Sequence, residues 1–232
     1  MSVLDLDLGN SNLKWRIDGG PARRCPAGEL SGVLPDALSG QAIERIRLCS
    51  VGADPERLQE VLERACPGAA VERAAVAPDR VGLACGYSDP GRLGVDRWCA
   101  LLGAREIARR TLVADIGTAL TIDYLDGDAH LGGYIVPGLD LMVSSLVAGT
   151  AGIRPQQASM EDGLAPARNT GDALRRGALL AAVGLIERAA LMHGEPWPVL
   201  LSGGGARLIA GCRPDWDEQP DLVLEGLAIA LP

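Results

Sequence analysis

Residues 4–11 read LDLDLGNS, and residues 112–119 read LVADIGTA. Aligned without a gap, the two stretches place Asp7 on Asp115 and a glycine on a glycine, 108 positions apart. In the first copy apolar and acidic residues alternate up to Asp7, in the second a short apolar run leads to Asp115, and a second strand pattern follows each turn. This is the pattern of an antiparallel hairpin. The repeat predicts one structural unit that occurs twice, and an internal duplication is the simplest account of it.

A strand that ends in a carboxylate and turns through glycine is suited to phosphate. The glycine lets backbone N–H groups approach phosphate oxygens, and the carboxylate can hold a cation or its water. Asp5 and Asp7 point to the same face of the first predicted strand, but only Asp7 immediately precedes the turn, so the pattern favours Asp7. A single Asp-x-Gly is also ordinary hairpin chemistry, and Asp7 alone would favour a plain turn.

The second copy of the motif changes this interpretation. A glycine turn at residues 203–205 follows another predicted strand, so the chain carries two candidate phosphate clamps and a candidate nucleotide loop. The glycine turn is also explained as a close connection between a strand and a helix, and the two explanations are compatible. Two clamps on related halves are the layout of actin-like and hexokinase-like ATPases, which bind ATP in the cleft between two domains.

The pattern of strands, turns and helices predicts an α/β fold. We expect duplicated ribonuclease H-like domains of the actin-like ATPase type, with mixed sheets flanked by helices. Residues 1–110 would form the domain with the first phosphate motif, and residues 111–232 the domain with the second. Residues 21–40, rich in Gly, Pro and Ala, are expected to be irregular, and Asn169 with Thr170 is expected to open a long alanine-rich helix.

Composition and charge argue against several classes of protein. Hydrophobic residues make up 47% and charged residues 22% of the 232 residues, the balance of a globular protein. The net charge of -8 disfavours nucleic acid as a partner. No apolar run approaches the roughly 18 residues that span a bilayer, and no signal sequence precedes the first strand, so we expect no membrane association and a cytoplasmic location. Two histidines and six cysteines without a C-x-x-C pair give little support to a zinc site, a disulfide framework or a Ser/His/Asp triad.

The segment between the two clamps supplies candidate acceptor residues. Asp96 and Arg97 open a predicted helix after a glycine-rich loop that has the composition of a substrate rim. An acid in the first turn of a helix is favoured by the helix dipole, whereas a cation there is not, so Arg97 is expected near an anionic ligand or a carboxylate. As a pair, Asp96 would accept the proton of an attacking hydroxyl and Arg97 would hold an anionic group of the substrate.

Taken in order, these motifs resemble those of the type III pantothenate kinases over nearly the whole chain. The similar segments are DLGNSNLK at residues 7–14, GVDR at 94–97, DIGT at 115–118 and HLGGYIVPG at 130–138. Ser11 stands where the family frequently has threonine. The resemblance implies ATP-dependent phosphorylation of pantothenate, the first step of coenzyme A synthesis, with Mg²⁺ and a monovalent cation such as K⁺ or NH₄⁺.

The resemblance also implies a role for individual residues. Asp96 would be the general base, and Asp115 would coordinate the monovalent cation. The residues implied for ATP are Asp7, Leu8, Gly9, Asn10, Ser11, Asn12, Leu13, Lys14 and Thr118. The residues implied for pantothenate are Tyr87, Gly94, Val95, Asp96, Arg97 and Thr170, the last of them from a partner subunit. Family members are homodimers whose site lies near the subunit interface.

Two other functions remain open on the same fold. Phosphate clamps do not determine which molecule accepts the phosphoryl group. A sugar or carboxylate kinase, or a phosphatase of the exopolyphosphatase kind, is therefore an alternative. A regulator that binds nucleotide or a partner protein without turnover is an alternative from another class. The intact carboxylates at Asp7, Asp96 and Asp115 favour an enzyme over a regulator, and the acidic charge disfavours direct contact with DNA.

Overall fold

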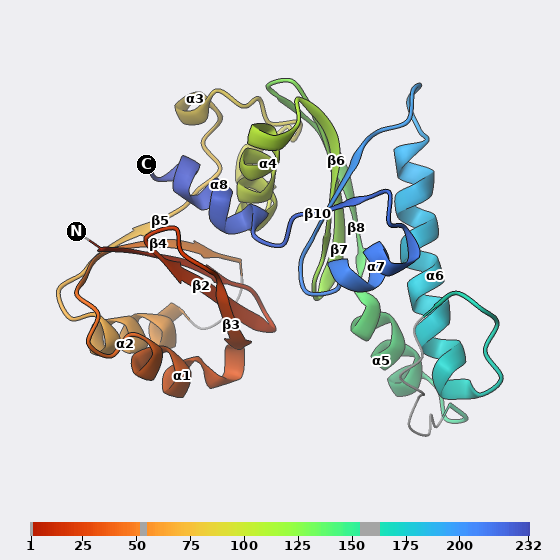
Figure 1. Cartoon of the computed structure of the whole chain (residues 1–232), viewed down its shortest axis with the longest axis horizontal. Helices are drawn as coiled ribbons and strands as arrows, with labels where there is room; N and C mark the ends of the chain where they lie inside the picture. Colours follow the sequence, from red (N-terminus) through yellow and green to blue (C-terminus); the bar gives the residue numbers. More distant parts are fainter. Residues whose placement is uncertain (1, 52–54, 154–162) are drawn as a thin grey trace. The chain divides into compact units, whose positions relative to one another are not determined.

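The structure is a computed structural model that describes residues 2–51, 55–153 and 163–232. The chain forms two compact units, coloured along the sequence in Figure 1. The first unit comprises Met1–Ile107 together with Asp221–Pro232, and the second comprises Ala108–Pro220. The chain passes from the first unit to the second after Ile107, close to the expected domain boundary at residue 110. The last twelve residues, expected in the second domain, pack instead with the first unit.

A five-stranded mixed sheet forms the first unit, in the order β3-β2-β1-β4-β5. The strands are β1 (Ser2–Leu8), β2 (Asn12–Ile17), β3 (Arg23–Pro26), β4 (Ile43–Ser50) and β5 (Ala70–Arg73). β1 pairs antiparallel with β2 and parallel with β4, which confirms the first predicted hairpin. Because side chains alternate along a strand, the leucines of LDLDL enter the core on one face while Asp5 and Asp7 project from the other.

Helices cover both faces of this sheet (Figure 1). On the leucine face α1 (Leu30–Ala37) and α2 (Pro55–Ala65) pack into the core. The carboxylate face carries α4 (Val95–Ile107) and α8 (Leu222–Ala230), which contact β4 and β1. The short helical turns of this unit are η1 (Ala27–Glu29), α3 (Pro78–Val81) and η2 (Pro90–Arg92).

The expectation that residues 21–40 are irregular is wrong, because they contain β3, η1 and α1. Three leucines spaced four residues apart, Leu30, Leu34 and Leu38, are at most 3% exposed and line the buried side of α1. This spacing is typical of a helix, but three apolar positions among glycines and a proline were too few to predict one.

Contacts from α2 replace what Pro35 removes from α1. Proline has no N–H to donate within the helix, so the carbonyl of Ser31, one turn earlier, loses its usual partner. The guanidinium of Arg64 donates to that carbonyl, and Arg57 donates to the Ser31 hydroxyl and to the carbonyl of Gly28. α1 is therefore stabilised by tertiary contacts more than by its own propensity.

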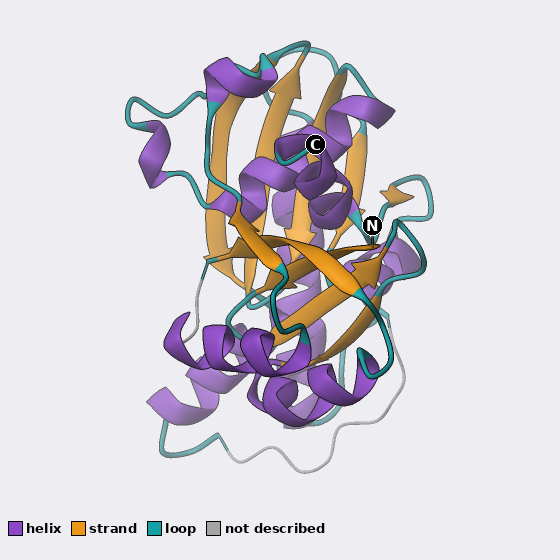
Figure 2. Cartoon of the chain, turned by 90° about the vertical axis from the view of Figure 1, so that its left-hand side faces the viewer, coloured by secondary structure: helices purple, strands orange, loops and turns teal. Residues whose placement is uncertain are grey.

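The sheet of the second unit has the order β10-β9-β6-β7-β8. Its strands are β6 (Arg110–Ile116), β7 (Ala119–Asp126), β8 (Ala129–Pro137), β9 (Val199–Ser202) and β10 (Asp217–Glu218). β6 pairs antiparallel with β7 and parallel with β9, as β1 does with β2 and β4. Figure 2 shows the strands of each unit as one sheet with helices against it. The shared order and strand directions confirm the predicted fold class of duplicated domains.

Three helices complete the second unit: α5 (Leu139–Gly149), α6 (Thr170–Ala190) and α7 (Ala206–Cys212). α6 and α7 pack on the apolar face of the sheet. The side chain of Asn169 accepts a hydrogen bond of 2.9 Å from the backbone N–H of Asp172, so the predicted N-cap is confirmed. Among the helices that the structure describes, none is both long and apolar enough to cross a membrane.

Two glycines allow α8 to pack directly on α4. A Cβ atom on Gly226 would lie 1.7 Å from the carbonyl oxygen of Cys99, and one on Gly103 would lie 2.4 Å from the carbonyl oxygen of Leu222. The two helices therefore meet backbone to backbone, and any larger side chain at either glycine would force them apart. This contact holds the C-terminal segment in the first unit.

Candidate functional site

Asp5 and Asp7 occupy different surroundings although they share one face of β1. Asp5 is 2% exposed, and its carboxylate oxygens lie 2.9 Å from Arg16 Nε and 3.1 Å from Arg47 Nε. Its charge is thus neutralised inside the unit. Asp7 is half-buried and ends the strand beside the turn. The structure therefore makes Asp5 part of the buried framework and leaves Asp7 as the candidate site residue.

The predicted ATP segment forms the end of β1, a tight turn and the start of β2. The backbone N–H of Gly9 donates 3.0 Å to the carbonyl of Asn12, which closes the turn. Asn10, Ser11 and Asn12 are exposed there. Lys14 lies directly opposite Asp7 in the β1–β2 register. The turn thus offers exposed polar groups between a carboxylate and an ammonium.

Leu8 and Leu13 belong to the same predicted segment but have fully buried side chains. Both pack into the core of the first unit. Only their backbone atoms are available to a ligand at the turn. The segment therefore divides into polar residues that can contact phosphate and leucines that anchor the turn.

Asp96 lies in the first turn of α4, where its carboxylate folds back over the helix start. Its Oδ1 accepts a hydrogen bond of 2.8 Å from the backbone N–H of Arg97. A Cβ atom on Gly94 would lie 2.5 Å from the same oxygen, so glycine is required beside the carboxylate. Val95, between them, is half-buried. The predicted GVDR motif is thus a local arrangement that presents one carboxylate at a helix N-terminus.

A buried thiol brings Asp7 and Asp96 into one neighbourhood. Cys49 is the partner of Asp7 in the β1–β4 register, and it is fully buried against Cys99 of α4. A hydrogen bond with the Cys99 thiol, burial, and the charges of Asp7 and Asp96 together raise the pKa of Cys49 well above its ordinary value. Cys99 follows Asp96 by three residues, about one helical turn along α4, and α4 packs on β4, the neighbour of β1. Within the first unit, the end of β1 and the start of α4 therefore lie in one region.

Arg97 and Tyr87 form the other contact at the start of α4. Arg97 Nη1 donates 2.8 Å to the Tyr87 hydroxyl, and the guanidinium carbon lies 5.6 Å from the centre of the ring. Arg97 is 5% exposed and Tyr87 is half-buried. The sequence led us to expect an anion near Arg97, and the structure shows a phenol hydroxyl and ring among its contacts. Two predicted substrate residues are thereby brought together.

Asp115 ends β6 in the second unit beneath a tight glycine loop. Gly203 has φ +84°, and a Cβ atom there would lie 2.8 Å from Asp115 Oδ1 and 2.6 Å from the carbonyl oxygen of Ile116. The N–H of Gly205 donates 2.9 Å to that same carbonyl. The glycine turn is therefore a close connection between β9 and α7, which was one of the two explanations that the sequence allowed. Its backbone packs directly against Asp115 Oδ1 because position 203 has no side chain.

The second predicted clamp is an exposed turn supported from behind by the end of β8. Gly117 donates 2.9 Å to the carbonyl of Ala119, and Gly138 donates 2.9 Å to the carbonyl of Thr118. A Cβ atom on Gly138 would lie 2.1 Å from the carbonyl oxygen of Gly117. With Asp115, the turn offers carboxylate, hydroxyl and carbonyl oxygens, which are ligands for hard cations, while the hydroxyl and the backbone N–H groups can donate to a phosphate. The residues therefore fit a cation and a phosphate.

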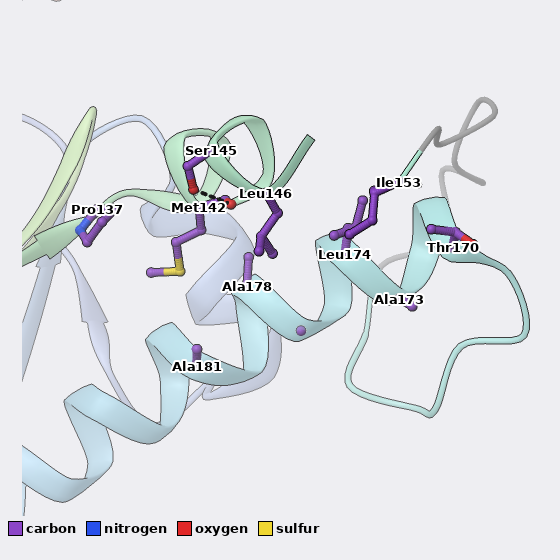
Figure 3. A pocket seen from close by; sticks show the side chains of 11 residues that line it. Pro137, Met142, Ser145, Leu146, Ile153, Thr170, Ala173, Leu174, Ala178 and Ala181 are labelled. Carbon is purple, nitrogen blue, oxygen red and sulfur yellow. Dashed lines mark hydrogen bonds between the residues drawn. The ribbon is translucent and has the colours of Figure 1, made fainter. Parts of the chain in front are cut away.

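Thr170 lies apart from the clamp of its own unit, beside a pocket of about 590 Å³ between α5 and α6 (Figure 3). The pocket is mainly apolar, with Met142, Leu146 and Leu174 among its walls. Its described lining includes neither Asp115 nor Thr118. Among the described residues, the pocket extends from Thr170 to Pro137, which pairs with Ala119 beside the phosphate turn.

Cys49 and Asp221 are neighbours of the candidate site that the sequence did not predict. Cys49 has the pattern of an ordinary core thiol. Asp221, whose Oδ1 lies 2.6 Å from Lys14 Nζ, is 207 positions away in the sequence and was expected in the other domain. The one sequence feature that could have drawn attention to this pair is that Lys14 is the only lysine of the chain.

Comparisons with known proteins agree with one another on a family. The family model described as type III pantothenate kinase matches residues 3–191. A type III pantothenate kinase of Pseudomonas fluorescens is 40% identical over 247 residues, and one of Pseudomonas aeruginosa is 39% identical over 250, each covering 99% of both chains.

Solved structures agree on the fold. A protein described as a Baf family transcriptional activator from Campylobacter jejuni superposes with a TM-score of 0.66 at 23% identity, over 98% of this chain and 96% of that one. MreB 5 of Spiroplasma citri, bound to AMPPNP, gives 0.50 at 14% identity, over 98% and 95%. Both likenesses support the expected actin-like fold.

Proposed function

The chain belongs to the type III pantothenate kinase family, and from that premise we propose that it transfers a phosphoryl group from ATP to the primary hydroxyl of pantothenate. The product, 4'-phosphopantothenate, begins coenzyme A synthesis. One observation supports the assignment of residues most strongly: Asp7 pairs with Cys49 of β4, and α4, which carries Asp96 in its first turn, packs on β4, so a phosphate clamp and a candidate base are neighbours in one unit.

Asp96 is the general base of the proposed reaction. Its carboxylate accepts the proton of the pantothenate hydroxyl as the oxygen–phosphorus bond forms. Phosphoryl transfer needs little covalent help from the protein, and positioning with charge neutralisation supplies most of the rate. The hydrogen bond from the backbone of Arg97 and the glycine at position 94 hold the carboxylate in place. A base fixed in this way is already oriented when the substrate arrives.

Each hairpin turn carries its own candidate contacts for ATP phosphates. In the first, Ser11, Lys14 and backbone N–H groups are the contacts, while Leu8 and Leu13 contribute backbone only. In the second, Thr118 is exposed at the turn and supplies a hydroxyl. Mg²⁺, when bound with ATP, neutralises charge on the transferred phosphoryl group, and Asp7 is the residue that would hold the ion or its water.

Pantothenate is held through its carboxylate by Arg97, with Tyr87 beside it. The guanidinium is buried and oriented by the hydroxyl of Tyr87, so it can meet a carboxylate with little loss of side-chain freedom. Gly94 and Val95 line the approach to Asp96 through their backbone. A single cation of this kind gives an acidic protein a defined place for an anionic substrate.

Asp115 coordinates a monovalent cation, K⁺ or NH₄⁺, in this proposal. The carboxylate and the carbonyl of Ile116 are the oxygen donors at the end of β6, and the glycine loop packs closely against both. Such an ion adds positive charge next to the phosphates without directional bonding. Asp7 and Asp115 thus have different roles although the duplication made them equivalent.

The enzyme works as a cytoplasmic homodimer in this proposal. Leu141, Leu146 and Leu180 on α5 and α6 are 45%, 48% and 55% exposed, which is unusual for leucines on adjacent helices. A second copy that covers this face would bury them. It would also bring the Thr170 side of the α5–α6 pocket to the partner, so Thr170 contacts the pantothenate bound by the other subunit.

An acceptor panel tests the proposed function. The purified protein is incubated with ATP, Mg²⁺ and K⁺, together with pantothenate, glycerol, a hexose or acetate in separate reactions, and ADP release is followed. Only pantothenate is expected to give turnover. Phosphorylation of glycerol, sugar or acetate without pantothenate turnover would replace this function with the rival kinase. Phosphate release from polyphosphate would replace it with the phosphatase.

A further inference from the structure

Two cation–carboxylate pairs of matching spacing tie β2 to α8. Lys14 and Arg16 are two residues apart on β2, so their side chains share one face of the sheet. Asp221 immediately precedes α8, and Glu225 follows one helical turn later. Lys14 Nζ lies 2.6 Å from Asp221 Oδ1, and Arg16 Nη1 hydrogen-bonds Glu225 Oε1.

Both pairs continue across to β1, where Asp5 is opposite Arg16 and Asp7 is opposite Lys14. The face of the sheet therefore carries two parallel rows of charged groups. The inner row is Asp5, Arg16 and Glu225, and the outer row is Asp7, Lys14 and Asp221.

The two rows differ in burial. In the inner row, the side chains of Arg16 and Asp5 are 6% and 3% exposed and that of Glu225 is 55% exposed, and Arg16 also donates 2.9 Å to the carbonyl of Leu224. In the outer row, Lys14 and Asp221 are 25% and 37% exposed and lie next to the β1–β2 turn. The cation of the inner row is thus enclosed and tied to the backbone of α8, while the cation of the outer row is accessible beside the turn, where a ligand can reach it.

The cation of the outer row is exceptional in this chain. Lys14 is the only lysine, and the other 21 of the 22 basic residues are arginine. An ammonium is a compact charge with three N–H donors, so it can face a carboxylate and a phosphate oxygen at the same time. Its partner Asp221 is also the residue at which the chain returns from the second unit to the first.

We propose that Asp221 is a positioning residue for Lys14: its carboxylate fixes the ammonium beside the β1–β2 turn, where the ammonium meets the phosphates of ATP. This inference rests on the proposed function, because it takes that turn to be a phosphate site. A lysine side chain loses much rotamer freedom when it binds. Pairing with Asp221 removes that freedom before ATP arrives, so the loss no longer weakens ATP binding.

Substitution of Asp221 tests the proposal. Asp221→Asn keeps the size of the side chain and removes its charge. We expect the KM for ATP to rise roughly two- to fivefold, the effect that one part-exposed ion pair can contribute, while the KM for pantothenate stays at the wild-type value. Asp221→Glu is expected to restore most of the ATP affinity.

The inner row supplies the matched control. Glu225→Gln removes the equivalent carboxylate one turn along α8, and we expect it to lower the Tm without changing the KM for ATP. If Asp221→Asn and Glu225→Gln lower the Tm alike and leave the KM for ATP alike, Asp221 has only a structural role and the proposal is overturned.

Amine labelling gives a readout that does not depend on the acceptor. Because Lys14 is the only lysine, an acylating reagent modifies no side chain amine but this one, and mass spectrometry of its peptide follows the rate. We expect ATP to protect Lys14 in the wild type and Asp221→Asn to speed the labelling. No turnover of pantothenate and no protection by ATP in the wild type would refute the proposed function. Turnover and protection in the wild type, with an unchanged labelling rate and KM for ATP in Asp221→Asn, would refute this inference alone.

Discussion

Arg97 Nη1 donates a hydrogen bond of 2.8 Å to the hydroxyl oxygen of Tyr87, and it does so from the first turn of a helix, where a cation opposes the dipole. The guanidinium is 5% exposed, so the arrangement holds a buried positive charge at a fixed position. A guanidinium oriented in this way can form a bidentate pair with a carboxylate. The pantothenate carboxylate is the anion that the proposed function supplies.

Loss of the Tyr87 hydroxyl is expected to weaken substrate binding. Tyr87→Phe removes one hydrogen bond to Arg97 and should raise the KM for pantothenate by roughly three- to tenfold, since such a bond contributes about 0.5–1.5 kcal/mol. The kcat and the KM for ATP should change little. Steady-state kinetics with each substrate varied in turn measures this. Tyr134→Phe, on β8 of the second unit, is the control, and equal KM values for pantothenate in the two variants would contradict the role of Tyr87.

Asp96→Asn is expected to abolish most turnover without unfolding the protein. Removal of a general base costs about 10²- to 10⁴-fold in rate, so kcat should fall by that amount while ATP still binds. The control is Asp79→Asn, which removes an exposed acid from the first turn of α3. If Asp96 served only as a favourable acid at a helix start, the two variants would behave alike. A kcat near the wild-type value in Asp96→Asn would remove the base assignment.

Alkaline pH is expected to destabilise the protein through Cys49. The hydrogen bond with Cys99, burial and the nearby carboxylates raise the pKa of this thiol in the folded state. Above the pKa of about 8.5 of a free thiol, the unfolded chain loses this proton while the folded chain keeps it. The folded state then binds more protons, so the free energy of unfolding falls as the pH rises, by at most about 1.4 kcal/mol per pH unit for one thiol.

Urea denaturation between pH 7 and pH 10 measures this dependence. Cys49→Ala should flatten the alkaline decline in the free energy of unfolding. Stability curves of wild type and Cys49→Ala that stay parallel across this range would show that the thiol is not held protonated by its surroundings.

Gly226→Ala is expected to loosen α8 from α4. The added Cβ would lie 1.7 Å from the carbonyl oxygen of Cys99, and overpacking of this kind costs about 1–3 kcal/mol. Gly184→Ala, within α6, meets no atom within 4 Å and should be neutral or stabilising by up to about 1 kcal/mol. Denaturant unfolding compares the two. Equal stability of both variants would mean that α8 does not depend on this close contact.

The cation role of Asp115 predicts a specific change in ion dependence. Wild-type activity should be high in K⁺ or NH₄⁺ and low in Na⁺ at the same ionic strength. Asp115→Asn should lower the activity in K⁺ to about the level seen in Na⁺, because one charged oxygen donor is lost. A variant that keeps full discrimination between K⁺ and Na⁺ would assign the ion to other residues.

Local pattern was sufficient to predict the hairpins and most helices of this fold. The alternation in LDLDL predicts which face of β1 is buried. The repeated Asp-x-Gly turn predicts a second sheet with the same strand order. Asn169 likewise predicted the start of α6 from the chemistry of a helix cap. In each case the cause lies within a few neighbouring residues, which is why the sequence was informative.

Tertiary contacts account for what the sequence did not predict. α1 contains Pro35 and depends on arginines of α2, so the helix propensity of its own residues does not predict it. α8 joins the first unit through backbone contacts with α4, a helix more than a hundred residues earlier. The separate surroundings of Asp5 and Asp7, and the pairing of Lys14 with Asp221, likewise depend on segments distant in sequence.

Turnover of pantothenate tests the central claim most directly. The purified chain is incubated with ATP, Mg²⁺ and pantothenate in K⁺, and ADP release is measured together with 4'-phosphopantothenate by mass spectrometry. The account predicts equal amounts of the two products, with loss of both in Asp96→Asn. ADP release that is independent of pantothenate, or no release under these conditions from folded protein, would contradict it.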